Sequence, residues 1–388
     1  MCNKSVVRFP NGPQLPGKFH YSAFSNDLDL APTRTLGEVI AMSPEAMARA
    51  SKPVMYAYNE LLQVAASLED DGYRRLMTEC LASPKITFLE MYPSDDDRAK
   101  LFKEMVRLGF FNPEDHPDEV WPRGHMEPQT YLTAASSHND FYNAHPGGLA
   151  MTVAYNVRTA DAYTTNYRQM LGLPINRDLP AAALCVHEYP KVWLYQWLDD
   201  GSWLEEPRTV YDDTWHAHCI YVTAELMHRR FDARIVMAVA AAHQLSMLDA
   251  SMDGKKVVCD WIGPDRVAHF IKSAAIMAQV DPVDYGLLER KGGEMVLAPV
   301  PAEQWITHLA DMNWPYTMGA AQLQTWPMLK QISADDLGLS AGDLAGRPFN
   351  QFKNYVWSQL SQIALYEILV REGFDAARAT VNRLVAKG

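Results

Sequence analysis

The segment 181–191, AAALCVHEYPK, joins an apolar run to a histidine, a glutamate and a lysine. The apolar run indicates a buried helix end, which His187 and Glu188 close. An unpaired buried carboxylate is costly, so such a group is normally paired or bound to a metal. Lys191 adds a cation within reach of anything held there. The alternative is a capped helix end at which His187 and Glu188 simply reach solvent.

Outward from this segment, the apolar residues recur at helical spacing along most of the chain. Residues 220–231 and 235–247 follow this spacing, and the second stretch is apolar almost all round, which indicates a central helix. Residues 305–328 and 350–387 are also predicted to be helical, whereas residues 295–301 are too short and too rich in proline. No convincing run of alternating strands is present. The sequence therefore predicts an all-α protein.

The domain organisation is predicted from changes in composition. Residues 114–129 are rich in proline, histidine and charge, and they form the best candidate boundary. We expect an N-terminal arm and helical extension over residues 1–130 and a helical metal-binding domain over residues 131–285. A C-terminal helical extension, residues 286–388, would pack on that core.

Charge and composition restrict the classes of partner. The 388 residues carry a formal net charge of −12, which argues against nucleic acid, because phosphate backbones are bound by clustered Lys and Arg. The 5 cysteines are odd in number and form no C-x-x-C pair, as expected for reduced thiols in a cytoplasmic protein. No apolar run approaches the roughly 18 residues that a membrane helix needs. We expect a small-molecule substrate. The sequence leaves open whether the protein forms a homo-oligomer.

Histidines at or near apolar faces are the candidate metal ligands. They are His187 beside Glu188, His218 and its neighbour His216 where a helix begins, His243 within the central helix, and His138 and His145 before the helix that starts near Leu149. Imidazole nitrogens and carboxylate oxygens together suit iron, manganese, zinc, nickel and cobalt. The sequence does not show that these side chains converge.

The motif from His187 to Lys191 resembles the H-D-x-x-K segment of the HD-domain superfamily of metal-dependent phosphohydrolases, with Glu188 in place of the aspartate. The order of segments is similar too. The Gly-Gly-Leu at 147–149 comes first, then the His-acid pair, then His218-Cys219 where the family often has His-Ser. His243 comes last, where the family often has His-His. The resemblance covers roughly residues 135–285.

This resemblance implies an HD-like core of five or more helices that holds one or two divalent ions. It implies that His187, Glu188, His218 and His243 are metal ligands, with Glu188 and Lys191 as catalytic residues and Lys191 in contact with an anionic substrate group. Thr152 stands where the family has its first-helix histidine, so that ligand is either missing or supplied by His145 or His138. A closing aspartate is not obvious, and the candidates are Asp249, Asp253 and Asp260.

Three functions follow as hypotheses. The first is a metal-dependent hydrolase acting on a small phosphate ester or a related small molecule, in which the metal activates water. The second is an iron-dependent oxygenase or lyase of the same superfamily. Aromatic residues near the motif (Trp193, Tyr195, Trp197, Trp203 and Trp215) would suit a less charged ligand, although core packing explains them as simply. The third is a non-catalytic protein that has kept the fold and lost the metal.

Overall fold

The computed structural model describes residues 32–82, 84–115, 128–206, 217–243, 251–252, 255–256 and 264–388. Residues 1–31, with which the expected N-terminal arm begins, lie outside the described residues, as does most of the candidate boundary at 114–129. His216, Trp215, Asp249, Asp253 and Asp260 also lie outside them.

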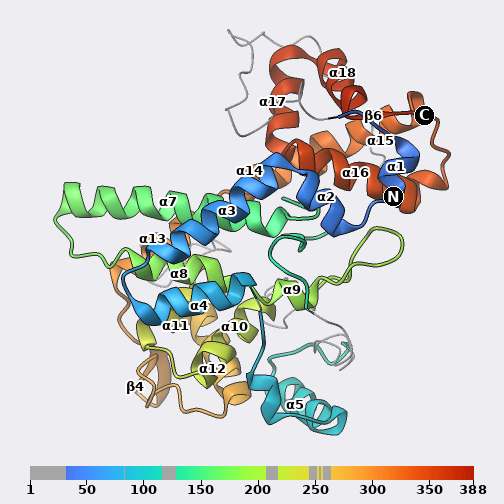
Figure 1. The fold of residues 1–388 in the computed structure, drawn as a ribbon. Coiled ribbons are helices and arrows are strands. Elements are labelled where there is room, and N and C mark those ends of the chain that lie inside the picture. The colour runs from blue at the N-terminus through green and yellow to red at the C-terminus, as the bar shows by residue number, and fades with distance from the viewer. Residues whose placement is uncertain are drawn as a thin grey trace.

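Helices form nearly all the regular structure of the described residues, which confirms the all-α prediction (Figure 1). The strands are short and pair only in twos: β1 (Arg34–Thr35) with β6 (Val385–Ala386), β2 (Ser251–Met252) with β3 (Lys255–Lys256), and β4 (Leu288–Lys291) with β5 (Glu294–Leu297). The β4–β5 hairpin covers the first part of the proline-rich stretch 295–301, which was predicted not to be helical. The parallel β1–β6 pair brings the first described residues next to the end of the chain.

The first group of helices has clear N-terminal signals. Its members are α1 (Leu36–Ala41), α2 (Pro44–Ala50), α3 (Lys52–Ser67), α4 (Asp71–Ala82), the short 3₁₀ helix η1 (Phe88–Met91) and α5 (Asp95–Arg107). The Ser43 hydroxyl accepts a hydrogen bond from the backbone of Ala46, and Pro44 occupies the first helical position. Ser51 caps α3 in the same way. Such caps satisfy N–H groups that a helix leaves without partners.

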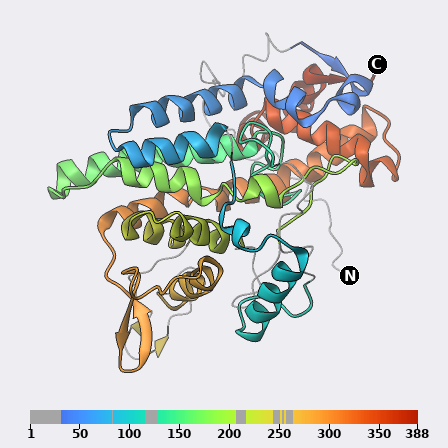
Figure 2. The same cartoon turned by 60° about the horizontal axis from the view of Figure 1, so that its bottom comes forward.

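The central helices pack around one large apolar core. They are α7 (Gly148–Leu171), α8 (Asp178–His187), α9 (Lys191–Leu194), α10 (Ala217–His228), α11 (Ala233–Ala240), α12 (Pro264–Ala278) and α13 (Ala302–Asp311). α3 packs against α7, and α8 contacts α7, α4, α11 and α13; Figures 1 and 2 show these helices from two sides. Every residue of α8 is buried, so this helix lies at the centre of the helical layers.

The C-terminal helices build a second apolar core. They are α14 (Trp314–Met318), the π-helix η2 (Gly319–Thr325), α15 (Trp326–Asp335), the 3₁₀ helix η3 (Asp343–Ala345), α16 (Arg347–Gln359), α17 (Gln362–Glu372) and α18 (Phe374–Leu384). Side chains of α1 such as Val39 pack into this core with Trp357 of α16. The helices predicted over 305–328 and 350–387 are therefore confirmed, with breaks between them, except at the end of the second range, where Val385–Ala386 form strand β6.

A buried lysine ties the C-terminal helices to the loop that precedes α7. The ammonium of Lys353 donates hydrogen bonds to the carbonyls of Asn139 and Ala144, at 3.0 and 3.2 Å. It lies 4.8–5.4 Å from three indole rings, those of Trp203, Trp326 and Trp357. Burial lowers the pKa of Lys353, whereas the carbonyl oxygens and aromatic faces around it stabilise its charged form. The C-terminal helices thus help to fix the loop 139–145 beside the centre described below.

The large core crosses the expected domain limits at 130 and 285. It runs from Ala57 of α3 to Ala310 of α13 and includes residues of α4, α5 and α12. All three expected regions consequently contribute described residues to this large core, while the second core lies mainly among the C-terminal helices. Cys80, Cys185 and Cys219 are buried there as free thiols. Within the described residues, no helix has the length and the apolar character required to cross a membrane.

Candidate metal centre

The polar end of α8 is buried rather than solvent-exposed. His187 is the last residue of the helix and Glu188 its C-cap, and they are 0% and 1% exposed. At the other end of α8, Asp178 accepts backbone hydrogen bonds from Glu69 and Asp70, which anchors the helix on α4. The alternative that His187 and Glu188 reach solvent is therefore wrong. The charge of this pair must therefore be balanced by other groups inside the protein.

The imidazole of His187 is held in one orientation by the backbone. Its Nδ1 lies 2.8 Å from the carbonyl oxygen of Leu184, and because a carbonyl only accepts, Nδ1 is the donor. In the neutral ring, Nε2 then carries a lone pair. This atom lies 3.3 Å from Oδ1 of Asp311 and 3.7 Å from Oε1 of Glu188 but makes no hydrogen bond with a described residue. A lone pair that faces two carboxylates suits a bound cation between them.

His218 at the start of α10 is oriented by a second carboxylate. Glu206 Oε2 accepts from the backbone N–H of His218 at 3.0 Å and from its Nδ1 at 2.7 Å. The hydroxyl of Tyr195 donates to the other oxygen of Glu206 at 3.2 Å. With Nδ1 engaged, Nε2 of His218 faces Oε2 of Glu188 at 3.6 Å. A carboxylate behind an imidazole is the usual support of a metal-binding histidine.

His243 also points into this cluster, but it lies beyond the central helix. The sequence predicted His243 within a helix, whereas α11 ends at Ala240 because Ala241 leaves the helical backbone conformation. Nε2 of His243 lies 3.5 Å from Nε2 of His218 and 3.5 Å from Oδ2 of Asp311. The turn after α11 directs the imidazole away from the helix axis and toward α8 and α13.

Asp311, the last residue of α13, is the functional candidate that the sequence analysis missed. It is 4% exposed, and its Oδ1 accepts a hydrogen bond of 2.6 Å from the side chain of Asn156 on α7. Asp311 lies outside the expected domain of residues 131–285, in which the closing aspartate was sought. The signal in the sequence was His308 followed three residues later by Asp311. That spacing places both on one helix face, and both are buried.

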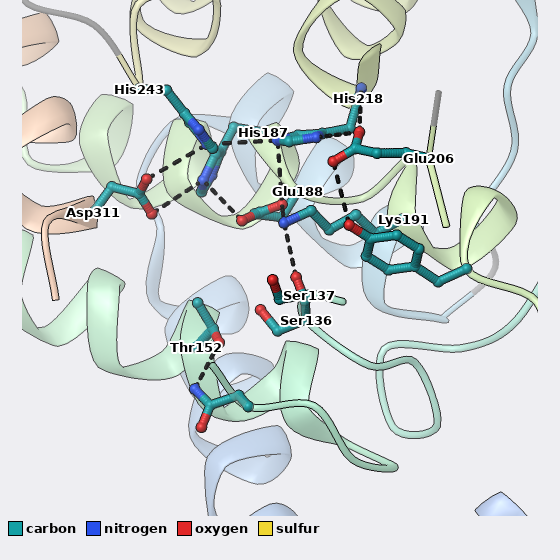
Figure 3. A network of polar contacts seen from close by, with 12 residues as sticks. Ser136, Ser137, Thr152, His187, Glu188, Lys191, Glu206, His218, His243 and Asp311 are labelled. Atoms are coloured by element: carbon teal, nitrogen blue, oxygen red, sulfur yellow. Dashed lines mark hydrogen bonds and ion pairs between the residues drawn. The ribbon is translucent and has the colours of Figure 1, made fainter. Parts of the chain in front are cut away.

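Four ligand atoms from α8, α13 and the turn after α11 come together (Figure 3). One atom each of His187, Glu188, His243 and Asp311 lies within 4.8 Å of the others, and these residues could hold a metal ion. A second, three-membered group consists of His218, Cys219 and His243 and shares His243 with the first. The mixture of imidazole nitrogen and carboxylate oxygen suits first-row transition metals. The predicted ligands His187, Glu188, His218 and His243 are therefore neighbours in space.

Lys191 lies inside the centre as the partner of Glu188. Its Nζ is 2.5 Å from Oε2 of Glu188, 2.8 Å from the carbonyl oxygen of Ser136 and 3.3 Å from the hydroxyl of Tyr142. A lysine ammonium has three N–H donors, so each donor has a partner among the described residues. Contact with an anionic substrate group, which the family resemblance implies, would require one of these partners to be exchanged.

The charges of these groups stabilise one another. Burial alone would raise the pKa of Glu188, but Lys191, His218 and His187 outweigh it and lower that pKa. Burial would lower the pKa of Lys191, yet the carboxylate of Glu188 keeps it raised. The pKa of Glu206 falls to about 2 despite burial, because His218 lies beside it. Both carboxylates therefore stay ionised, as metal ligation and imidazole orientation require.

Neither His145 nor Thr152 joins the ligand group. His145 is buried and its Nδ1 lies 3.1 Å from the carbonyl oxygen of Pro146, while Thr152 accepts a hydrogen bond from Asn143 at 2.8 Å. Figure 3 shows Thr152 apart from the imidazoles. The residue of α7 that reaches the centre is Asn156, one turn after Thr152. His138 is not part of the group either, and its ring lies beside Glu205 at 3.1 Å.

Most of the aromatic residues near the motif belong to the apolar cores. Trp197 and Trp203 pack edge to face with centroids 4.8 Å apart, and Trp203 donates to the carbonyl of Ser137. Tyr195 differs, because its hydroxyl contacts Glu206 and its ring lies 5.9 Å from the ammonium of Lys191. Core packing therefore accounts for the two tryptophans, and Tyr195 supports the centre.

Comparisons of the chain with protein-family models, with curated proteins and with solved structures found no match.

Proposed function

We propose that this protein is a metal-dependent hydrolase of the HD type that acts on a small phosphate ester or a related small molecule. The observation that carries the proposal is the convergence of His187, Glu188, His243 and Asp311, whose ligand atoms lie within 4.8 Å of one another. The order of the motifs along the chain supports the assignment to the HD type, with Asp311 as the closing aspartate.

The side chains behind the ligands support the same conclusion. The carbonyl of Leu184 fixes the tautomer of His187, and Glu206 fixes that of His218. Asn156 holds the carboxylate of Asp311 at 2.6 Å. Ligands that are oriented before the ion arrives bind it more tightly, and such partners typically contribute 10–100-fold in affinity. A bound divalent ion would lower the pKa of a water molecule to about 7 and polarise a phosphoryl oxygen.

The second candidate is an iron-dependent oxygenase or lyase. It is favoured by the set of two imidazoles and one carboxylate formed by His187, His243 and Asp311, because two histidines and a carboxylate are the usual ligands of non-haem iron oxygenases. Tyr142 and Tyr195 beside Lys191 add an aromatic wall. Iron in the isolated protein, together with oxygen uptake, would distinguish this function from hydrolysis supported by manganese, zinc, nickel or cobalt.

The third hypothesis is a fold that has lost its metal, which the threonine at position 152 suggests. Three imidazoles beside ionised carboxylates, two of them buried and that of His243 12% exposed, weigh against it. Without a cation, such a buried group is unfavourable and would tend to be replaced by apolar residues. A chain that binds no metal would nevertheless revive this hypothesis.

The first experiment is elemental analysis of the protein as isolated and after removal and return of metal. We expect bound transition metal in the wild type and strong loss in His187→Ala, while His228→Ala, at the far end of α10, keeps the wild-type content. Hydrolysis of a chromogenic phosphate monoester is then measured with each metal. Metal absent from the wild type and from reconstituted samples would refute both enzymatic functions.

A second variant tests the acid of the motif. Glu188→Gln keeps the size of the side chain and removes its charge, so metal affinity should fall while the fold persists. Circular dichroism checks the fold and elemental analysis checks the metal. Unchanged metal content would mean that Glu188 is not a ligand.

A further inference from the structure

The buried network around the centre has an unbalanced charge. Three carboxylates, those of Glu188, Glu206 and Asp311, are at most 4% exposed. Among the described residues, Lys191 is the lysine or arginine that ion-pairs with this network. Imidazoles that bind metal are neutral, so three negative charges and one positive charge give the described part of this network a net charge of minus two. One divalent ion would bring the network to neutrality, whereas two would leave it positive.

The two oxygens of Glu188 face different partners. Oε1 lies 3.7 Å from Nε2 of His187, on the side of Asp311. Oε2 lies 2.5 Å from Nζ of Lys191 and 3.6 Å from Nε2 of His218. A carboxylate that bridged two ions would have to offer Oε2 to the second ion. That oxygen is already engaged by an ammonium group.

The ammonium of Lys191 is held firmly in this position. The carbonyl of Ser136 and the hydroxyl of Tyr142 accept its other hydrogen bonds, at 2.8 and 3.3 Å. The rings of Tyr142 and Tyr195 lie 5.7 and 5.9 Å away. Lys191 is 2% exposed, so its charge is not dispersed into solvent. A second metal ion beside it would be repelled strongly at such low dielectric.

We infer that the centre holds a single divalent ion, and that Lys191 takes the place of a second cation at Oε2 of Glu188. This inference rests on the metal binding proposed above. It makes Lys191 a positioning residue that sets the number of ions, rather than a ligand. Reactions that need two adjacent metal ions would then be closed to this protein, and a single-ion mechanism would remain for either proposed chemistry.

The test counts Mn²⁺ ions in the full-length protein. Metal-free wild type is titrated with Mn²⁺, the bound ion is measured after gel filtration, and the electron paramagnetic resonance spectrum is recorded. We expect one equivalent per chain and the spectrum of an isolated ion. Lys191→Gln keeps an amide donor for the Ser136 carbonyl but removes the charge, so it should bind a second equivalent and show an exchange-coupled pair. Lys191→Arg, which keeps the charge, should stay at one equivalent.

Each outcome decides a separate point. Two equivalents in the wild type would overturn the inference and leave the proposed metal dependence standing. A folded Lys191→Gln protein with one equivalent would overturn the part assigned to Lys191. No binding in the wild type would refute the proposed function itself. If Lys191→Gln does not fold, the wild-type count still decides the number of ions, and the uncharged Lys191→Met replaces Lys191→Gln in the test of the charge.

Discussion

Nε2 of His187 lies 3.3 Å from Oδ1 of Asp311, although the two residues end different helices and lie far apart in the sequence. Asp311 also faces His243 and accepts a hydrogen bond from the side-chain amide of Asn156. This one carboxylate therefore joins α7, α8, α13 and the turn after α11. Both the candidate metal centre and the packing of the central helices depend on it.

Asp311→Asn should reduce metal affinity by at least the 10–100-fold typical of residues that support a metal site, because it removes a charged ligand. A metal at 100 times its dissociation constant stabilises a folded protein by about 2.7 kcal/mol. Thermal unfolding with and without metal should show this gain in stability for the wild type. Most of the gain should be absent from Asp311→Asn. The exposed Asp375→Asn is the control and should behave like the wild type. An equal metal-dependent gain in Asp311→Asn would show that Asp311 is not a ligand.

Glu206→Gln should weaken metal binding about 10–100-fold without unfolding the protein, because the carboxylate that orients His218 is lost. The neighbouring Glu205→Gln is the matched control. Its carboxylate is 40% exposed and contacts His138, outside the ligand group. The metal affinities of the two variants would be measured by competition with a metal-binding dye. Similar affinities for both variants would mean that Glu206 does not support the site.

Gly148→Ala should destabilise the protein by about 3 kcal/mol or more, since overpacking against backbone forces the structure to move. An added Cβ would lie 1.8 Å from the carbonyl oxygen of Asn143, in the loop that Lys353 fixes. Gly37→Ala in α1 meets no atom within 4 Å and should be neutral or slightly stabilising. Denaturant unfolding measures both. Equal stability of the two variants would contradict the close approach at Gly148.

His145 should make the protein sensitive to acid. Burial lowers its pKa to about 4 from an ordinary value of 6.5. Between these two pKa values the unfolded chain binds a proton at His145 and the folded chain does not. The free energy of unfolding therefore falls as the pH falls through this window. The loss amounts to about 3 kcal/mol once pH has fallen below about 4, where the folded protein is protonated as well.

Replacing His145 by Asn removes this group. The unfolding free energy of His145→Asn should therefore fall less steeply than that of the wild type between pH 6.5 and pH 4. Denaturant titrations at several pH values measure the two slopes. Parallel slopes would show that His145 titrates alike in the folded and unfolded chains.

The chemistry of the α8 end was readable from its local pattern. An apolar run that closes on His187 and Glu188 predicts a buried polar pair, and the pair is buried. His218 and His243 were found because each follows or opens an apolar helical segment. These inferences use only neighbours along the chain, where burial and helical spacing leave a direct trace.

Asp311 escaped prediction for the opposite reason. An acid at the end of an amphipathic helix is common at the surface, and nothing near it along the chain says that it faces His187. The partners of Lys191 could not be predicted either, because Ser136 and Tyr142 belong to a loop before α7 that is distant from Lys191 in the sequence. Contacts between remote segments depend on how helices pack, and the local patterns of a sequence do not reveal that packing.

By itself, the sequence determined the helical class, the buried polar pair and a set of nitrogen and oxygen donors. Only the tertiary structure decided which donors meet: it brought in Asp311, Asn156 and Glu206, left His145 aside, and paired Lys191 with Glu188. The physical reason is one of range. Burial and helix formation are governed by residues a few positions apart, whereas a metal centre requires atoms from distant helices to lie within a few ångströms.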